Sequence, residues 1–250
     1  MTKAKFAACV RLTTGVATAL LLSVPAHAQD ISINFGQGTG LTERVIQLIA
    51  LLTVLSLAPS ILVMMTSFTR IVVVLSLLRT ALGTATAPPN AVIVSLALFL
   101  TAFVMGPAFQ RSYDVGIRPL VANEITAEQA FERSAGPFKE FMLKNVRDKD
   151  LKLFNDLSKE TLPATPEQIS LRILIPAFMI SELKRAFEIG FLLFLPFLII
   201  DLVVASVLMS MGMMMLPPVV VSLPFKLIFF VLVDGWSLVA GSLVQSYGSG

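Results

Sequence analysis

Residues 209–218 read Met-Ser-Met-Gly-Met-Met-Met-Leu-Pro-Pro, and half of them are methionine. They separate two long apolar runs, 185–208 and 219–244. Gly212 before the last methionines and the Pro-Pro pair after them interrupt the helical pattern, so this stretch is predicted to be a hairpin tip or a loop. The second half of the chain is therefore predicted to fold as two apolar helices that meet at this tip.

The methionines of this tip are candidates for a functional surface. Methionine is unbranched and polarizable, so it adapts to irregular gaps, and three consecutive methionines cannot share one face of a helix. In a loop repeated around a ring of identical subunits, they would form a soft apolar constriction, and such constrictions gate pores by excluding water. The alternative is that they only contact lipid or pack in a core. The candidate residues are Met209, Met211, Met213, Met214 and Met215.

The composition places the chain in the membrane class. It has 250 residues, of which 56% are hydrophobic, and its mean hydropathy is +0.84, which is too apolar for an ordinary soluble domain. The net charge of +3 comes from three basic residues, Lys3, Lys5 and Arg11, at the N-terminus. Without them the chain has 16 basic and 16 acidic residues, so its charge gives no indication of nucleic-acid binding.

The N-terminus has the parts of a secretory signal. Lys3 and Lys5 are followed by an apolar run, 12–24, and by the small-x-small sequence 26–28. This order predicts cleavage between Ala28 and Gln29; the alternative is an uncleaved first membrane helix. The only cysteine and the only histidine, Cys9 and His27, would leave with the signal. The mature chain would then have no thiol nucleophile, imidazole base, or cysteine or histidine metal ligand, so no enzyme activity, cofactor or metal site is predicted.

The fold class is predicted to be all-α, with about four long apolar helices broken by proline or glycine. Pro59 is expected to kink the apolar stretch 45–82, and Pro176 is expected to break 171–180, which is too short to span a membrane and suggests a re-entrant or broken helix. The expected divisions are a signal at 1–28, a linker at 29–44, a first helix pair at 45–110, a charged helical domain at 111–172 and a second helix pair at 173–250.

The charged segment 111–172 differs in kind from the rest of the chain. It carries ten basic and ten acidic residues, which predicts a small solvated helical domain inserted between the second and third apolar helices. Thr126 followed by Gln129, and Thr165 followed by Gln168, read as capping boxes at helix starts. Pro137 fits the first turn of a helix.

Lys226 lies in an apolar segment, where an ammonium group is costly unless it is paired or reaches water. Asp201 lies about as far before the methionines as Lys226 lies after them, so a helical hairpin would bring the two to similar depth. Asp201 is therefore the expected partner within the chain. Glu182 of a neighbouring subunit is the alternative partner, and a third possibility is that Lys226 reaches water on its own.

Two stretches carry a family resemblance. Residues 176–183 read Pro-Ala-Phe-Met-Ile-Ser-Glu-Leu, with Gly190 shortly after them, and residues 224–236 begin Pro-Phe-Lys and end Asp-Gly-Trp. Both resemble the signatures of the FliP family, and the resemblance extends over essentially all of the mature chain. It implies a component of the flagellar type III export gate, a multi-pass protein of the bacterial inner membrane within the flagellar basal body.

The resemblance also implies partners and a role for the methionines. FliP-like proteins form a homo-oligomeric ring, a pentamer, with FliQ-like and FliR-like subunits, and unfolded flagellar proteins pass through it. In that family the methionine-rich loop forms a gasket around the pore. The alternative functions are a small-solute secondary transporter, for which broken helices and buried charges are also typical, and the homologous gate subunit of a virulence injectisome. The transporter lacks support because the sequence has no internal repeat.

Overall fold

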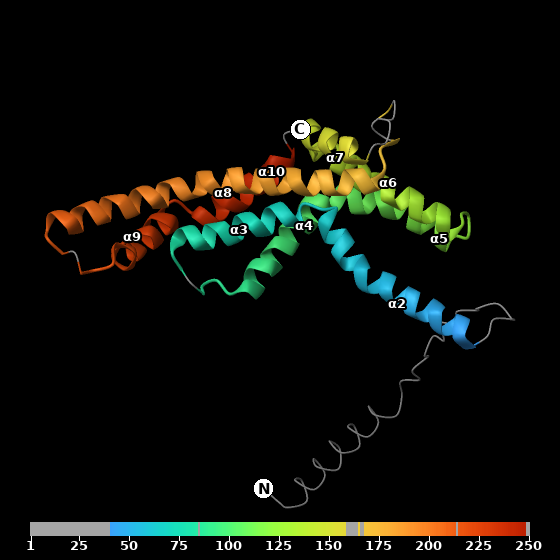
Figure 1. Cartoon of the computed structure of the whole chain (residues 1–250), viewed down its shortest axis with the longest axis horizontal. Coiled ribbons are helices and arrows are strands. Elements are labelled where there is room, and N and C mark those ends of the chain that lie inside the picture. The colour runs from blue at the N-terminus through green and yellow to red at the C-terminus, as the bar shows by residue number, and fades with distance from the viewer. Residues whose placement is uncertain (1–40, 85, 159–164, 166–167, 214, 249–250) are drawn as a thin grey trace, which may run out of the picture. The chain divides into compact units, whose positions relative to one another are not determined.

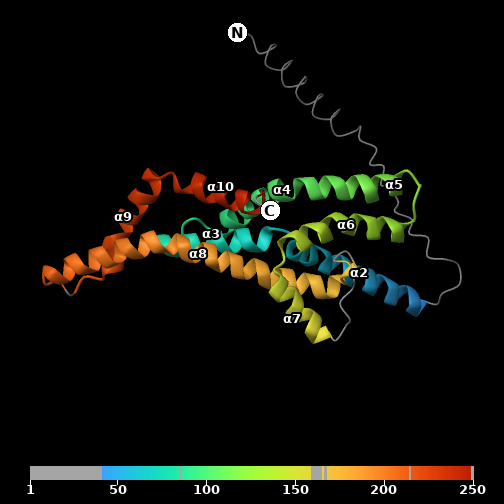
Figure 2. The same ribbon diagram turned by 90° about the horizontal axis from the view of Figure 1, so that it is seen from above.

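The structure is a computed structural model that describes residues 41–84, 86–158, 165, 168–213 and 215–248. Every regular element in these ranges is helical, which confirms the all-α prediction. Figures 1 and 2 show the arrangement. The helices are α2 (Leu41–Met64), α3 (Phe68–Leu82), α4 (Asn90–Ser112), the π-helix η1 (Tyr113–Ile117), α5 (Arg118–Val121), α6 (Ala127–Asn145), α7 (Asp148–Ser158), α8 (Leu171–Ser210), α9 (Pro218–Leu232) and α10 (Gly235–Gly248).

The chain divides into two compact units, 1–52 and 53–250. Only the first half of α2 is described in the first unit, and its apolar side chains, such as Ile46 and Leu52, are exposed. The sequence predicts a kink at Pro59; α2 stays helical through position 59, so this proline does not end the helix. The break comes instead at 65–67, where a turn precedes α3. The apolar stretch 45–82 is therefore divided between two helices, and it does not form one long span.

Helix α8 is the longest element of the chain, and it corrects the expected break at Pro176. It runs for 40 residues without interruption through both Pro176 and Pro196. Each proline removes one hydrogen-bond donor and costs about 3 kcal/mol in a helix interior. Packing offsets this cost next to Pro176, since Leu174, Ala177 and Phe178 are fully buried. At 1.5 Å per residue, α8 is about 60 Å long, twice the hydrocarbon thickness of a bilayer.

The main core lies between α3 and α8, which run side by side (Figure 1). Helix α3 buries Ile71, Val74, Leu75 and Leu78, which recur at helical spacing and so form one face. Helix α8 approaches this face closely at Gly190, where an added Cβ would lie 2.3 Å from Leu77 Cδ1. Helices α4, α9 and α10 complete this cluster with further apolar side chains: Ile93, Ala97, Phe230, Val239, Leu243 and Tyr247.

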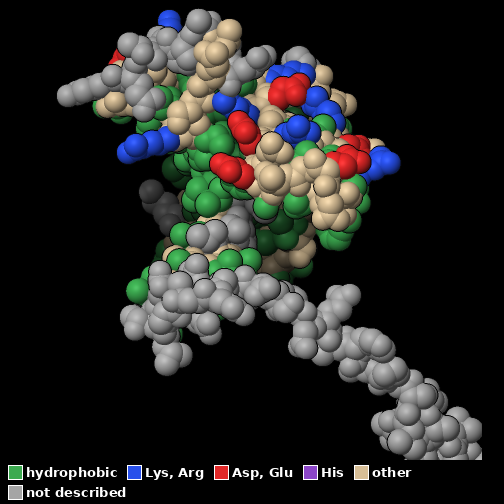
Figure 3. Space-filling model, turned by 90° about the vertical axis from the view of Figure 1, so that its right-hand side faces the viewer, with side chains coloured by type: hydrophobic (Ala, Val, Ile, Leu, Met, Phe, Trp, Pro, Cys, Tyr) green, Lys and Arg blue, Asp and Glu red, His purple; other side chains and the backbone are tan. Residues whose placement is uncertain are grey.

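The charged segment packs against the apolar helices. A second core contains Met105 of α4, Phe138 and Met142 of α6, and Leu174 and Phe178 of α8. On the outer face of the molecule that Figure 3 shows, positively and negatively charged side chains are interspersed. The described part of the segment is thus helical, as expected, and two of its apolar side chains, Phe138 and Met142, are buried against α4 and α8.

The ends of α6 test two local predictions. The capping box is confirmed: Gln129 N donates to Thr126 Oγ1, and Thr126 N donates to Gln129 Oε1. Pro137 lies inside α6 and not in a first turn, so that prediction is wrong. The expected box at 165–168 falls partly outside the described residues. The N-cap of α8 is Ser170, which accepts from Arg172 N.

A π-helix joins α4 to α5, and it brings the backbone of Gly116 against α6. A Cβ at Gly116 would lie 1.9 Å from Ser134 Oγ and 2.7 Å from Ala130 O. Two hydrogen bonds reinforce the contact: Ser112 Oγ donates to Ser134 O at 2.9 Å, and Ser134 Oγ donates to Ser112 O at 3.4 Å. Only glycine fits at this crossing because a backbone carbonyl cannot move aside as a side chain can.

Within the described residues, two helical stretches are long and apolar enough to cross a membrane, Asn90–Val121 and Leu171–Ser210. A third candidate is the pair α9 and α10, which are bent by 63° relative to each other (Figure 2). The bend lies at 233–234, where Asp234 has a φ of 50°. These spans agree with a multi-pass membrane protein.

Candidate functional site

The methionine stretch forms the turn between α8 and α9, as the sequence predicts (Figure 1). Helix α8 ends at Ser210, and Gly212 adopts a left-handed φ of 73°. This conformation lets Met213 N donate back to Leu208 O at 3.0 Å, which closes the end of the helix. Pro217, with an extended backbone, then precedes Pro218 at the first position of α9.

The methionine side chains at this tip are exposed to different degrees. Met209 lies in the last turn of α8, and Met211 caps that helix; both are more than half exposed. Met213 is less exposed, and Met215 is 98% exposed. Met214 lies outside the described residues. The tip therefore presents a group of large apolar side chains that no other described part of the chain covers.

One buried ion pair ties the two helices of the hairpin together below the tip. Lys226 Nζ of α9 lies 2.6 Å from Asp201 Oδ2 of α8, and Ser222 Oγ donates to Asp201 Oδ1 at 2.5 Å. Lys226 Nζ also donates to Ala81 O of α3 at 3.3 Å. The ammonium is buried, and the carboxylate is partly exposed. The structure thus brings together the two residues whose depths match in the sequence.

A second ion pair lies where α3, α8 and α10 meet. Arg70 Nε donates to Glu182 Oε2 at 2.9 Å, and Nη2 of the same arginine donates to Oε1. Tyr247 OH also donates to Glu182 Oε2, and the Arg70 guanidinium lies over the Tyr247 ring at 3.8 Å from its centre. Arg70 and Glu182 are 1% and 0% exposed. Pairs of this kind are strongly destabilised when one partner is removed.

This arrangement bears on the alternative partner expected for Lys226. Both oxygens of Glu182 accept hydrogen bonds from Arg70 and Tyr247 of its own chain. Glu182 therefore has its hydrogen-bond partners within its own chain, and it is buried and does not face outward toward a neighbouring subunit. The sequence did not reveal that Arg70, Glu182 and Tyr247 meet, because no local pattern links residues so far apart in the chain.

A third cluster fastens α7 to α8. Arg147 Nε and Nη2 donate to the two oxygens of Asp150, and Ser181 Oγ of α8 donates to Asp150 Oδ2 at 2.6 Å. Burial acts to raise the pKa of Asp150, but the hydrogen bonds from Ser181 and Arg147 and the positive charges of Arg147 and Lys184 outweigh it. The pKa of Asp150 therefore lies below its ordinary value.

One further ion pair lies on α8, outside these clusters. Lys184 Nζ lies 3.5 Å from Glu188 Oε1 on the exposed surface of α8, at helical pair spacing. In the described part of the chain, no three His, Cys, Asp or Glu side chains are grouped closely enough to hold a metal ion. Ala28 and Gln29, the expected cleavage position, lie outside the described residues.

Comparison with known proteins gives one consistent result. Residues 51–243 match the model of the FliP family. The chain is 62% identical over 244 residues to the flagellar biosynthetic protein FliP of Caulobacter vibrioides, covering 98% of this chain and 92% of that protein. It is 56% identical over 202 residues to FliP of Bacillus subtilis, covering 81% and 91%. It is 49% identical over 243 residues to FliP of Rhizobium meliloti, covering 95% and 99%.

Proposed function

The chain belongs to the FliP family and is thus a non-enzymatic membrane component of the flagellar export gate; within that gate, we propose that its methionine-rich tip seals the pore. One observation carries this proposal: the tip of the α8–α9 hairpin is apolar and uncovered. No charged residue lies between Asp201 and Lys226 in the sequence. Met211 and Met215 are both exposed at the turn.

The seal requires several copies of the tip to meet. One hairpin covers only a small area. The proposed assembly is a homo-oligomeric ring, a pentamer of this chain, together with FliQ-like and FliR-like subunits. Such a ring would place the methionines around a common axis. Flexible thioether side chains could then fill the opening at rest and yield to an unfolded flagellar protein as it passes. A ring of apolar side chains also resists water and ions between passages.

The ion pair below the tip supports this role mechanically. In the described part of the chain, the backbone hydrogen bonds at the tip are those of its own turn, so the position of the methionines depends on how α8 and α9 are joined. Lys226 and Asp201 fix the spacing of the two helices, and Ser222 and Ala81 add hydrogen bonds to the same groups. The proposed role of this pair is to keep the tips of all copies at one level.

No observation specifically supports either alternative function, the solute transporter or the gate subunit of a virulence injectisome. The relatives that match over most of the chain are named as flagellar proteins, which favours the flagellar gate over the injectisome. The same names give no support to a solute transporter, and the pocket between α8 and α9 is lined by aliphatic and aromatic side chains such as Val204, Val221 and Phe229.

The test is to replace Met213, Met214 and Met215 together by alanine in the complete gate. We expect normal assembly but a leak of ions and small solutes, seen as growth inhibition or as raised conductance, because alanine cannot reach across the gap. The matched control replaces the same residues by leucine, which keeps an apolar side chain of similar volume and should leak less than the alanine variant. A triple alanine variant that seals as well as the wild type would mean that the tip only packs.

A further inference from the structure

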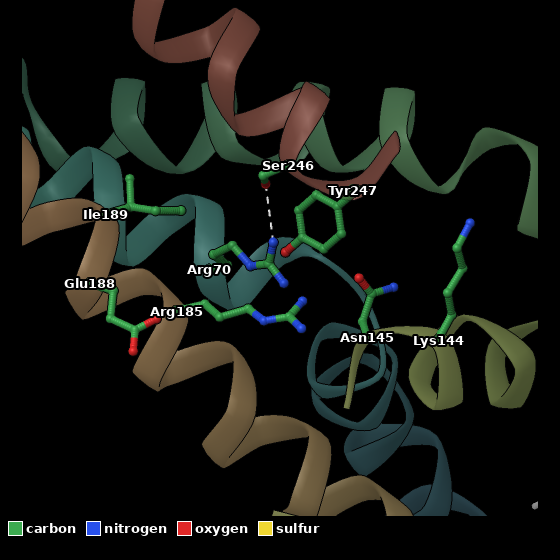
Figure 4. Close-up of a pocket in the computed structure, with 8 residues that line it drawn as sticks. All are labelled: Arg70, Lys144, Asn145, Arg185, Glu188, Ile189, Ser246 and Tyr247. Atoms are coloured by element: carbon green, nitrogen blue, oxygen red, sulfur yellow. Dashed lines mark hydrogen bonds between the residues drawn. The ribbon is translucent and has the colours of Figure 1, made fainter. Parts of the chain in front are cut away.

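A second, polar site lies far from the tip, at the junction of α3, α6, α8 and α10 (Figure 4). It is a pocket of about 390 Å³. Its wall includes two buried polar side chains, Arg70 and Asn145. Figure 4 shows Arg185 extending from α8 toward Asn145, with Lys144 on the far side, on α6. The proposed seal uses none of these groups.

The charges around this pocket do not cancel. Arg70 pairs with Glu182, and Glu188 at the rim pairs with Lys184 across 3.5 Å on the exposed surface of α8. Lys144 and Arg185 form no ion pair with any residue that the structure describes. Two positive charges are therefore left at one pocket, and Arg185 is only partly exposed. Such a pocket attracts an oxyanion, since a guanidinium offers paired donors that match phosphate or carboxylate.

The surface beside the pocket is apolar, which narrows the class of ligand. Ile189 and Leu192 follow Arg185 at spacings of four and seven, so they lie on the same side of α8. Ile189 lines the pocket, and Leu192, directly beyond it, is 64% exposed. Ile199 continues the same stripe and is also exposed. A cationic pocket followed by an exposed apolar stripe fits an amphiphile with an anionic head.

We propose that this pocket binds the headgroup phosphate of an anionic phospholipid, with an acyl chain lying along Leu192 and Ile199. Arg185 would hold the phosphate through two parallel hydrogen bonds, and Lys144 would add a second charge. Asn145 Nδ2 donates one hydrogen to Phe141 O and keeps a second hydrogen for the ligand. Basic pockets between membrane helices are known to bind anionic lipid headgroups in this manner.

The experiment is native mass spectrometry of the purified full-length chain with phosphatidylglycerol or phosphatidylcholine of identical acyl chains. We expect the wild type to retain one phosphatidylglycerol and to prefer it over phosphatidylcholine. The double substitution Lys144→Gln and Arg185→Gln should weaken phosphatidylglycerol binding about 30-fold, since two surface charges are lost. The matched control, Lys149→Gln with Lys152→Gln, removes the same charge from the exposed face of α7 and should bind as the wild type does.

A second pair of variants tests the acyl stripe. Leu192→Ser should weaken lipid binding, while Phe191→Ser should not, because Phe191 is equally exposed but lies about 120° around the helix from Arg185. Arg185→Lys keeps the positive charge but loses the two parallel hydrogen bonds of the guanidinium, so it should give an intermediate affinity. It also replaces the glutamine variant if that variant fails to fold.

Several results would overturn the proposal. Equal retention of phosphatidylcholine would show that the charges are not used, and displacement by inorganic phosphate at the lipid's own affinity would show that the acyl stripe is not used. Undiminished phosphatidylglycerol binding by the double glutamine variant would place the lipid elsewhere. If that variant instead changed only the oligomeric state, a carboxylate of another subunit would be the occupant. The outcomes on lipid binding do not bear on the seal, whose residues lie at the C-terminal end of α8 and in the turn that follows.

Discussion

Buried charges set the energetics of this chain at the scale of single residues. Arg70, Glu182 and Lys226 are almost completely removed from solvent, and each has a partner of opposite charge together with at least one further hydrogen bond. Desolvation makes such pairs poor sources of net stability, but it makes them costly to break. They therefore specify how the helices are arranged more than they add to the free energy of unfolding.

The pair of Lys226 and Asp201 gives a prediction at this scale. Lys226→Glu places two carboxylates together and should destabilise the chain by about 3 kcal/mol, measured as loss of the assembled gate on a native gel. Combining it with Asp201→Lys should restore assembly in part, because the pair is remade with opposite polarity. Rescue should stay incomplete, since the new carboxylate would face the carbonyl oxygen of Ala81. If the Lys226→Glu variant assembled normally on its own, the pair of Lys226 and Asp201 would not be needed for assembly.

Asp150 gives a pH prediction. Its pKa is lower in the folded chain than its ordinary value near 4, so the ionised form stabilises the fold. This stabilisation is complete above the unfolded pKa and is lost as the pH falls through the lower, folded pKa. Asp150→Asn should therefore destabilise the chain by about 1–3 kcal/mol at pH 7.

The matched control for Asp150 is Asp156→Asn, an exposed carboxylate on the same helix. Thermal unfolding in detergent at pH 7 and at pH 3 measures both variants. The deficit of Asp150→Asn should shrink at pH 3, where the wild-type carboxylate begins to take up its proton, and Asp156→Asn should stay close to the wild type throughout. A deficit that is equal at both pH values would contradict the role of the ionised carboxylate.

At the scale of elements, close contacts between helices limit which residues fit at a crossing. Gly116 is such a position, because its backbone lies directly against α6. Gly116→Ala would press a methyl group on Ala130 O, so η1 and α6 must separate, at a cost of about 1–3 kcal/mol. Gly136→Ala in α6 is the control, because nothing lies within 4 Å of its added Cβ, and alanine favours a helix by up to about 1 kcal/mol. The two melting temperatures should move in opposite directions; a stable Gly116→Ala variant would show that the crossing is loose.

The sequence predicted the helices and turns better than it predicted the contacts between distant segments. The capping box of Thr126 and Gln129, the hairpin around Gly212, and the similar depth of Asp201 and Lys226 depend on short stretches or simple counting. The continuous α8 was not foreseen, because burial of Leu174 and Phe178 overrides the tendency of Pro176 to end a helix. The cluster of Arg70, Glu182 and Tyr247 joins three distant segments, and no periodicity in one sequence reveals such a meeting.

At the scale of the whole molecule, the signal sequence remains a prediction. The order of Lys3 and Lys5, the apolar run and the small residues before Gln29 predicts export and cleavage. Intact-mass measurement of the chain from its native membrane should give a protein that begins at Gln29. A chain that retains Met1 would contradict this expectation, and the first segment would then be a membrane anchor.

The unbroken course of α8 also makes it a lever. Its N-terminal half is clamped at Ser181 by the Asp150 cluster, and its other end carries the methionines, about 45 Å away at 1.5 Å per residue. If α8 tilted by about 5° at the clamp together with α3 and α9, which pack against it, the tip would move sideways by roughly 4 Å over this arm, a distance comparable to the reach of a methionine side chain. In the proposed ring, a small torque applied at the charged helices would thus be amplified into a displacement large enough to part neighbouring tips, with no helix needing to unfold.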